Sequence, residues 1–298
     1  MFLACFWGTV AYAETAVVIL LGESGSAYSE VAGALRAELE RGGIAAADVK
    51  EGTDLAGLTR NPAKLYIAVG AVALQAALDA EAKVPVLATL LPQASYQRMV
   101  EQAGPLGGRQ ISAVWLDQPL SRQFALIRLA LPDKRRVGIV LGPQSSALSG
   151  SMSVTAEAQD LRLFTSRANT PDAIYTALQK LMGDIDVLLA APDPAVYNSN
   201  TIQSILLTTY RAQVPLIGFS PAYVKAGALL ALYSTPRQLG SQAGEIARAV
   251  LAGRPLPPAQ PPRDFSISSN THVAHSLGAH LADDAQLTER LRAIEVRP

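Results

Sequence analysis

Short apolar runs alternate with segments of helical spacing along almost the whole chain. Ala16–Leu21 (AVVILL) and Leu65–Val69 (LYIAV) are continuous and apolar, as expected for strands buried on both faces. Between them, Tyr28–Arg41 carries its apolar residues on one stripe and ends at Gly42-Gly43, which predicts a helix. Strands separated by helices form parallel sheets with right-handed crossovers. We therefore predict an α/β fold.

The alternation of strands and helices begins again near residue 135. About five strand–helix units on either side of residues 119–121 predict two similar α/β domains. One (β/α)₈ barrel is the structural alternative at this length. The restart and the late Pro-rich stretch, residues 253–262, favour two domains. The further predicted strands are Val84–Leu90, Ile111–Trp115, Arg136–Leu141, Leu161–Ser166, Ile185–Ala190, Val214–Gly218, Ala228–Tyr233 and Phe265–Ser269.

Composition excludes several classes of protein. The 298 residues contain 25 Lys+Arg and 25 Asp+Glu, so no basic excess is available for a nucleic-acid partner. Hydrophobic residues make up 49%, too many for a disordered chain. The single cysteine, Cys5, permits neither an internal disulfide nor a cysteine-based zinc site.

Residues 1–13 (MFLACFWGTVAYA) are apolar and uncharged. Ala11-Tyr12-Ala13 fits the small-x-small pattern before a signal-peptidase cut, and the charged chain begins at Glu14. We interpret this segment as the remnant of a secretory signal, its start shortened by a start codon placed too far downstream. The alternative is a first strand that begins early. We expect an exported, periplasmic protein without a mature cysteine, which suits an oxidising compartment.

Ligands of open parallel α/β sheets bind beyond the carboxyl ends of the strands. The loops at those ends are rich in Gly, Ser, Pro, Asn, Gln and Tyr, and therefore offer hydroxyls, helix N-terminal amides and aromatic faces. They predict a site for a small polar or amphiphilic molecule. The candidate ligand-binding residues are Ser24, Ser26, Gly70, Ala71, Pro92, Gln144, Ser145, Asp193, Tyr197, Asn198, Phe219, Ser220 and Tyr223.

The candidate carboxylate and the candidate aromatic residues could have a purely structural role instead of binding a ligand. Asp193, between two prolines at a strand end, could pair with a ligand ammonium, or could be a turn or helix-capping residue. Tyr197, Phe219 and Tyr223 could stack on a ligand, or could fill the core or rim of their own domain.

Catalytic and metal-binding patterns are weak. Gly22-Glu23-Ser24-Gly25-Ser26 follows a strand as a nucleophile elbow would, but Ser26 stands where G-x-S-x-G has its second glycine. The three histidines, His272, His275 and His280, lie near the C-terminus without a clear carboxylate partner. We predict no catalytic residue, no metal and no cofactor.

The stretch from Pro192 to Gly253 resembles the ABC-transporter substrate-binding family, which has the type I periplasmic binding protein fold and includes binders of aromatic amino acids. The match rests on VPLIGFSPAYVKAGALLAL, on the helix RQLGSQAGEIARAVLAG, and on the strand and turn at Val187–Asp193 followed by Asn198. The loops at Gly70-Ala71 and at residues 90–93 are plainer than in the family. Ser145–Ala158 is unusually Ser-rich where a regular helix is expected, which indicates either a looser helix or part of the binding rim.

The resemblance implies two Rossmann-like lobes with parallel sheets and three crossovers, closing on a ligand in the cleft by a hinge. Lobe 1 would be residues 14–118 plus 236–262, and lobe 2 residues 119–235 plus 263–298. The partners it implies are an amino acid or similar small organic solute and a membrane permease or receptor, with the protein acting as a monomer. The alternatives are a secreted serine hydrolase-like α/β enzyme using Ser24, or a ligand-sensing or scaffold protein with the same fold.

Overall fold

The computed structural model describes residues 16–60, 63–81, 83–105 and 107–295, so the predicted signal remnant at residues 1–13 lies outside the described residues. The chain divides into two compact units. The first unit comprises Met1–Leu91, Met99–Val114 and Gly240–Gln260, and the second comprises Pro92–Arg98, Trp115–Leu239 and Pro261–Pro298. Each unit has its own sheet and its own hydrophobic core.

The first unit is built on a five-stranded sheet of order β2-β1-β3-β4-β5, in which every pair of neighbours is parallel. Its strands are β1 (Val17–Leu21), β2 (Val49–Gly52), β3 (Leu65–Val69), β4 (Val86–Thr89) and β5 (Ile111–Val114). All residues of β3 and β4 are buried, as expected for strands covered by helices on both faces.

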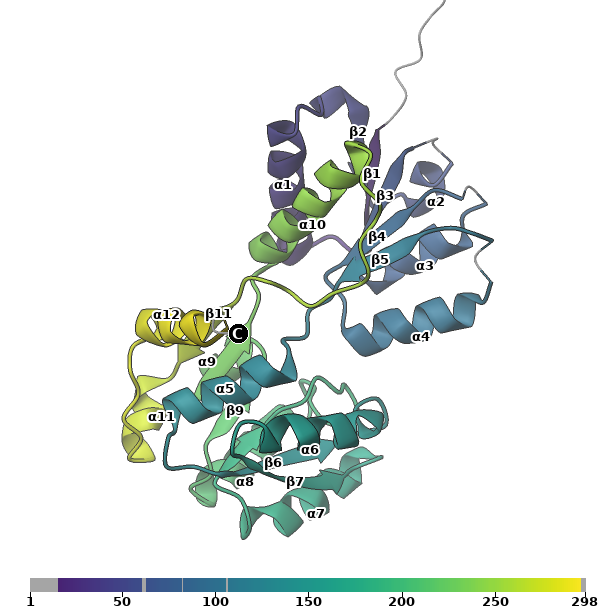
Figure 1. Ribbon diagram of the computed structural model, residues 1–298. Coiled ribbons are helices and arrows are strands. Elements are labelled where there is room, and N and C mark those ends of the chain that lie inside the picture. The colour runs from purple at the N-terminus through teal and green to yellow at the C-terminus, as the bar shows by residue number, and fades with distance from the viewer. Residues whose placement is uncertain (1–15, 61–62, 82, 106, 296–298) are drawn as a thin grey trace, which may run out of the picture. The chain divides into compact units, whose positions relative to one another are not determined.

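The α-helices of the first unit in the described part of the chain are α1 (Ser26–Arg41), α2 (Leu55–Leu58), α3 (Ala71–Asp79) and the larger part of α10 (Pro236–Leu251). Helix α4 (Gln93–Ala103) is divided, with residues 93–98 in the second unit and residues 99–103 in the first. Helices α1 and α10 lie side by side (Figure 1). A Cβ added at Gly240 would lie 2.5 Å from the carbonyl oxygen of Val31, and one at Gly244 would lie 2.5 Å from Cβ of Glu38. The two glycines therefore set how closely these helices approach.

The second unit has a six-stranded sheet of order β11-β10-β9-β8-β6-β7. Its strands are β6 (Arg136–Leu141), β7 (Arg162–Arg167), β8 (Val187–Leu189), β9 (Leu216–Gly218), β10 (Leu230–Tyr233) and β11 (Ser266–Ser269). Only β11 departs from the predicted parallel sheet: it pairs antiparallel with β10. Between β10 and β11 the chain passes through α10 (Pro236–Leu251), most of which belongs to the first unit, and then through the extended Pro-rich segment. This connection is not a crossover packed on the second sheet, so the rule for parallel strands does not apply to β11.

The helices of the second unit are α5 (Leu120–Ala130), α6 (Ser149–Glu157), α7 (Pro171–Met182), α8 (Ile202–Arg211), α9 (Pro221–Ala226), α11 (Thr271–Ser276) and α12 (Asp284–Glu295). One core cluster contains residues of α5, α6 and α12, and another contains residues of α7 and α8. The Ser-rich stretch forms a 3-10 turn, Ser146–Leu148, followed by α6. Ser151, Ser153 and Thr155 donate their hydroxyls to carbonyls three or four residues earlier, so these hydroxyls find their acceptors within the segment itself.

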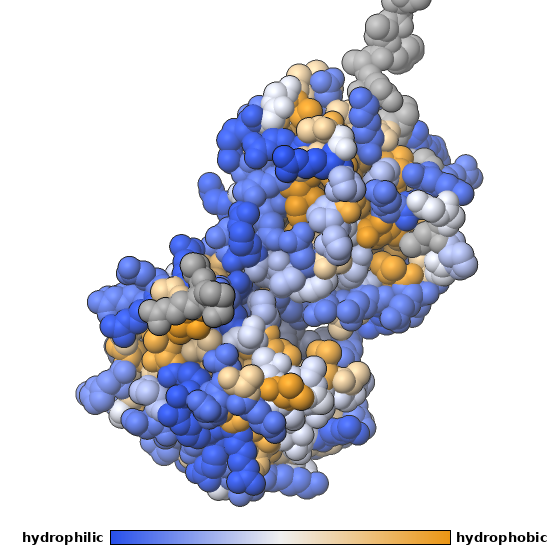
Figure 2. All heavy atoms as spheres, viewed as in Figure 1, coloured by the Kyte–Doolittle hydropathy of each residue, from blue (hydrophilic) through white to orange (hydrophobic). Residues whose placement is uncertain are grey.

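Figure 2 shows a largely hydrophilic visible face on each unit, with smaller orange areas of hydrophobic residues. Among the described residues, no helix has both the length and the apolar character needed to cross a bilayer.

Candidate ligand-binding site

In the first unit, the predicted site residues lie at the carboxyl ends of β1, β3 and β4. Ser24 is exposed in the loop after β1, and Ser26 is the first residue of α1. Gly70 follows β3 directly, Ala71 begins α3, and Pro92 precedes α4. The strand order places β1, β3 and β4 next to one another, so these loops share one edge of the sheet. The structure thus brings Ser24, Ser26, Gly70 and Ala71 to a common edge of the first sheet, where small side chains and backbone amides predominate. Pro92 follows β4 in the chain but belongs to the second unit.

Gly70 has a close neighbour that the sequence did not reveal. Its φ is 87°, a conformation that favours glycine, and a Cβ there would lie 2.8 Å from the hydroxyl oxygen of Tyr28. Tyr28 can therefore lie against this loop only because residue 70 has no side chain. Burial, and next the charge of Glu23, raise the pKa of Tyr28, so its hydroxyl stays a neutral donor at neutral pH.

The end of β4 carries local strain. Leu90 has a φ of 58°, which is uncommon for a residue with a side chain. The preceding Thr89 is fully buried, and its hydroxyl has no hydrogen-bond partner within the described structure. The carbonyl of Thr89 accepts from the amide of Gly70 at 2.8 Å, which ties the β3 and β4 loops together. Strained backbone of this kind is concentrated at functional sites, which supports ligand contacts at this edge of the sheet.

In the second unit, Asp193 is the hub of two strand-end loops. Its Oδ2 accepts from the amides of Gln144 and Ser145 and from the Ser145 hydroxyl, each at 2.9 Å, and its Oδ1 accepts from the amide of Ala195 at 3.1 Å. The residue is 1% exposed. A Cβ at Gly142 would lie 2.5 Å from the carboxylate, so a glycine there makes room for it. The predicted pairing of Asp193 with a ligand ammonium would have to compete with these four donors.

The three predicted aromatic residues form one cluster. The rings of Tyr197 and Phe219 meet edge to face with centroids 6.3 Å apart, and those of Phe219 and Tyr223 are 4.6 Å apart. Tyr197 is buried, whereas Phe219 and Tyr223 are half-buried beside the core. Burial raises the pKa of Tyr197 and raises the pKa of Tyr223 to about 12. Both hydroxyls are therefore neutral at physiological pH.

Asn198 and Ser220 lie beside this cluster in the sequence. The Asn198 amide donates to the carbonyl of Pro194 at 2.8 Å, and its oxygen accepts from the amide of Asn200 at 3.0 Å, so the side chain stabilises its own turn. Ser220 immediately precedes α9, and its side chain makes no capping hydrogen bond to that helix. Its hydroxyl thus has no role in starting the helix.

A cavity of about 410 Å³ lies within the second unit. Of the predicted residues, Gln144 and Ser145 line it, whereas Asp193 and the aromatic cluster do not. Its wall also includes Gln93, Leu148, Ser151, Met152 and Thr155, which belong to segments noted in the sequence, and Trp115 and Asp117, which the sequence reasoning missed as site residues. The Ser-rich stretch was the available signal, since three of these residues, Ser151, Met152 and Thr155, belong to α6.

Asp117 is the charged member of this wall. Its Oδ2 accepts from the amide of Gln93 at 2.5 Å, at the start of α4. Burial raises the pKa of Asp117 and outweighs the hydrogen bonds from the amides of Gln93 and Asp117 itself. The carboxylate is thus held next to the cavity at some electrostatic cost.

A buried polar network follows Asp117 in the chain. Gln118 donates to the Ser234 hydroxyl at 2.8 Å, and that hydroxyl donates to the carbonyl of Asp264. Arg122 donates to Gln118 at 2.8 Å, to the carbonyl of Pro262 at 2.9 Å and to Glu295 of α12. We call these residues the Arg122 network. It joins four chain segments that are far apart in sequence: residues 118–122, 234, 262–264 and 295.

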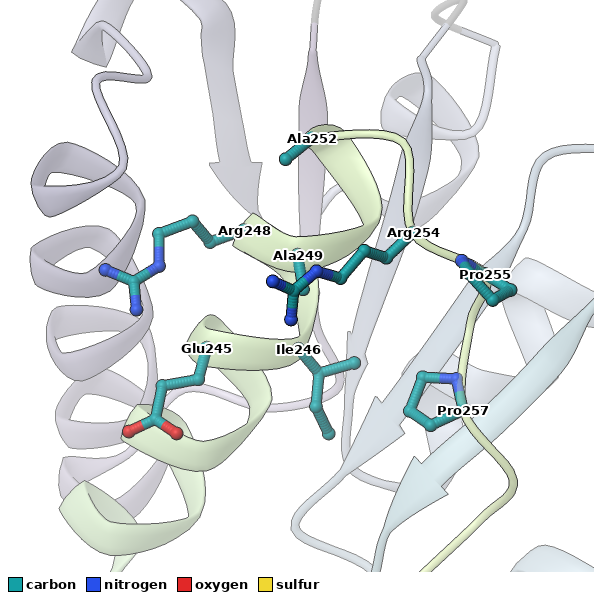
Figure 3. Close-up of a pocket in the computed structure, with 8 residues that line it drawn as sticks. All are labelled: Glu245, Ile246, Arg248, Ala249, Ala252, Arg254, Pro255 and Pro257. Carbon is teal, nitrogen blue, oxygen red and sulfur yellow. The ribbon is translucent and has the colours of Figure 1, made fainter.

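A groove of about 550 Å³ lies in the first unit, away from the strand-end loops (Figure 3). The last turns of α10 and the start of the Pro-rich segment form it. In Figure 3, Arg248 and Glu245 extend toward α1, while Pro255 and Pro257 stand on the opposite side. Arg248 lies close to Gly42, at the end of α1. The groove therefore lies by the amino-terminal edge of the sheet, where α/β folds do not place their ligands.

The sequence offered Ser24 as a candidate nucleophile and three histidines as candidate metal ligands. No group of three or more His, Cys, Asp or Glu side chains there could hold a metal ion. Ser24 is exposed, and all three histidines of the chain lie in or after α11, remote in sequence from the strand-end loops.

Comparison with known proteins decides the family. Residues 44–291 match the family model described as "ABC transporter substrate binding protein". The chain belongs to this family. The description of this family is that of a binding protein rather than an enzyme.

One curated protein and two solved structures are similar to this chain. A tyrosine-binding protein of Clostridioides difficile is 23% identical over 193 residues, which are 64% of this chain and 55% of that protein. The chain thus matches about half the length of this curated relative. The ligand-free, open structure of a substrate-binding protein with adhesive properties from Clostridium difficile has a TM-score of 0.68 at 18% identity, over 90% of this chain and 96% of that one.

A domain from Streptococcus pneumoniae in complex with L-Trp has a TM-score of 0.59 at 17% identity, over 92% of this chain and 98% of that one. These structures have the two-sheet α/β architecture of type I periplasmic binding proteins. The predicted fold class is therefore confirmed, and the barrel alternative is wrong.

Proposed function

We propose that this substrate-binding protein is exported, captures a small organic solute at its strand-end loops, and delivers it to an ABC-type transporter in the membrane. The family match over residues 44–291 carries this proposal. The placement of Gly70, Ser145 and Phe219 at strand ends of the two sheets supports it, because ligands of parallel α/β folds bind there.

Hinge closure is the physical mechanism we propose for capture. Lobe 1 would comprise residues 14–118 plus 236–262, and lobe 2 residues 119–235 plus 263–298. A ligand that contacts both lobes in the closed arrangement but only one lobe in the open arrangement binds the closed arrangement more tightly. It therefore shifts the equilibrium toward closure by that difference in binding free energy. Closure would be measured as a fall in the radius of gyration by small-angle X-ray scattering when a ligand is added.

The ligand class we propose is an amino acid or similar small organic molecule. The tyrosine-binding relative and the similar structure with bound L-Trp support an amino acid. Periplasmic localisation is part of the proposal, since the predicted signal remnant lies outside the described residues. We further propose that the protein acts as a monomer.

A thermal-shift screen against amino acids, nucleosides, sugars and small amphiphiles tests the proposal. A ligand at about 100 times its dissociation constant stabilises the folded state by about 2.7 kcal/mol, which raises the melting temperature measurably. The proposal fails if no compound shifts the melting temperature and a serine-reactive probe labels the wild-type protein but not Ser24→Ala. That outcome would instead support the hydrolase alternative.

A further inference from the structure

Apart from a short excursion at residues 92–98, the chain passes from one unit to the other at three places. These passages lie between residues 114 and 115, between 239 and 240, and between 260 and 261. Any motion of one unit against the other must bend these segments, because hinges are a few residues that absorb the change in backbone angles. The bonds that hold the ends of the passages therefore decide where bending can occur.

The Arg122 network holds the second-unit ends of all three passages. Gln118, just after the first passage, donates to the hydroxyl of Ser234, just before the second, at 2.8 Å. That hydroxyl donates to the carbonyl of Asp264, just after the third passage. Arg122 closes the triangle, since it donates to Gln118 at 2.8 Å and to the carbonyl of Pro262 at 2.9 Å. Each passage is thus bonded to the other two within the second unit.

The bonds of Arg122 supply partners that the third passage lacks in its own backbone. Residues 261–265 belong to neither helix nor strand, so their carbonyls need donors from elsewhere. Arg122 donates to the carbonyl of Arg263 at 3.2 Å as well as to that of Pro262, and it pairs with Glu295. It is only 6% exposed, and hydrogen bonds at such depth are stronger than in water. The network is therefore a firm connection.

The start of α10 is fixed to the same part of the chain. Gln238, in the first turn of this helix, donates to the carbonyl of Phe265 at 3.2 Å. Its side-chain oxygen accepts from the amide of Thr235 at 2.8 Å, which fixes the residue next to Ser234. The second passage therefore leaves the second unit from a helical turn that is bonded to the third passage.

On the first-unit side, the first and third passages are also tied to each other. The amide of Gln260 donates to the carbonyl of Ala113 at 2.8 Å, and both residues belong to the first unit. Residues 115–117 and residue 261 lie between this bond and the Arg122 network. We therefore expect the first and third passages to bend within these few residues.

We propose that the Arg122 network is a clamp that makes the second-unit ends of the three passages one rigid body and so restricts the two units to rotation about a single axis. This inference rests on the proposed function, in which closure captures the ligand. Without the clamp each passage bends separately, the ligand-free ensemble is broader, and closure costs more conformational entropy. The clamp thus raises the affinity for the ligand without contacting it.

Distances between spin labels test the clamp on the ligand-free protein. Labels are placed at Glu40→Cys in the first unit and Gln179→Cys in the second, both exposed, in a chain that also carries Cys5→Ala. Double electron–electron resonance gives the distribution of distances between the labels. We expect Ser234→Ala, which removes the hydroxyl that joins the three passages, to broaden this distribution roughly twofold.

Thr209→Val is the matched control, because it removes another buried hydroxyl of the second unit, one that donates to the carbonyl of Leu206 within α8. It should leave the width unchanged. Arg122→Met should broaden the distribution at least as much as Ser234→Ala does, and Ser234→Ala decides if the Arg122 variant does not fold. An unchanged width in Ser234→Ala, or equal broadening in the control, would overturn the inference. Since no ligand is present, either result would leave the proposed function intact.

The effect on affinity is measured by isothermal titration calorimetry with L-tyrosine as the probe. We expect Ser234→Ala to bind it about threefold to tenfold more weakly, because a smaller fraction of the molecules is ready to close. Thr209→Val should bind it as the wild type does. Equal affinities of Ser234→Ala and the wild type would contradict the role of the clamp in capture. Failure of the wild type to bind L-tyrosine would count against the proposed ligand class, and the distance measurement would then decide on the clamp.

Discussion

The strand-end loops of the first unit and those of the second reach their shapes in opposite ways. In the first unit the loop after β3 depends on a missing side chain: Gly70 leaves room for Tyr28. In the second unit the loops after β6 and β8 depend on a side chain that is present, since Asp193 gathers their amides. The strand-end edge of the first unit therefore presents backbone amides and small side chains to a ligand. The strand-end edge of the second unit presents loops that are fixed by Asp193 and that border a cavity.

Asp193→Ala should have the largest effect of the variants considered, because it leaves three amides of the second unit without their acceptor. We expect a loss of about 3–5 kcal/mol in the free energy of unfolding. Urea denaturation measures it, with the exposed Asp133→Ala as a control that should change stability by less than about 0.5 kcal/mol. A loss below about 1 kcal/mol would mean that the loops hold their shape without Asp193.

Arg122→Met tests the second buried polar network of the same unit. Arg122 is 6% exposed, contacts Glu295, and lies with its guanidinium carbon 4.6 Å from the ring centre of Phe265. Removing one partner of a buried ion pair leaves the remaining groups poorly satisfied, so we expect a loss of about 2–4 kcal/mol. Arg128→Met on the same helix is the matched control, with a single hydrogen bond of 3.3 Å to lose. Equal losses in the two variants would show that the network is not a special source of stability.

Gly70→Ala breaks the feature that distinguishes the first unit. An alanine at residue 70 would have to adopt a φ of 87°, and its methyl group would contact the Tyr28 hydroxyl. We therefore expect a loss of about 1–3 kcal/mol in the free energy of unfolding. Gly150→Ala in α6 is the opposite case, because nothing lies within 4 Å of its added Cβ. It should stabilise by about 0.5–1 kcal/mol, as alanine does in helices. Thermal unfolding of both variants measures the contrast, and a stabilising Gly70→Ala would refute the packing account.

Asp186→Asn has the smallest expected effect and a distinct pH dependence. Partial burial of Asp186 would raise its pKa, but hydrogen bonds from the Arg136 guanidinium and from the amides of Arg136 and Arg135 outweigh it and lower the pKa to about 2. The ionised form is thus favoured by folding. Its contribution is fully present above the ordinary pKa of an aspartate and is lost as the pH falls toward 2.

We expect Asp186→Asn to cost about 0.5–1 kcal/mol at pH 7, in the range of a well-formed surface ion pair. The difference between variant and wild type should shrink as denaturation is repeated at pH values from 7 down to 3. A difference that stays constant with pH would show that the charge of Asp186 does not contribute.

Local signals predicted much of the fold but little of the cavity. The bounds of β6 and α9 follow directly from an apolar run and from a proline at the first helical position. The edge strand β2 was missed because its sequence, VKEG, is largely polar and partly exposed. Asp117 was missed because its partner Gln93 is 24 residues away and no local motif marks it. The partners of Asp193, Gln144 and Ser145, are 49 and 48 residues away, so only the folded chain reveals its hydrogen bonds.

Amide hydrogen exchange with and without a saturating ligand from the thermal-shift screen tests the central claim most directly. If the strand-end loops capture the ligand, protection should increase at residues 22–28 and 70–72 of the first unit and at 142–148 and 193–198 of the second. Protection confined to residues 245–257, around the groove of Figure 3, would contradict the claim that the ligand binds at the strand ends.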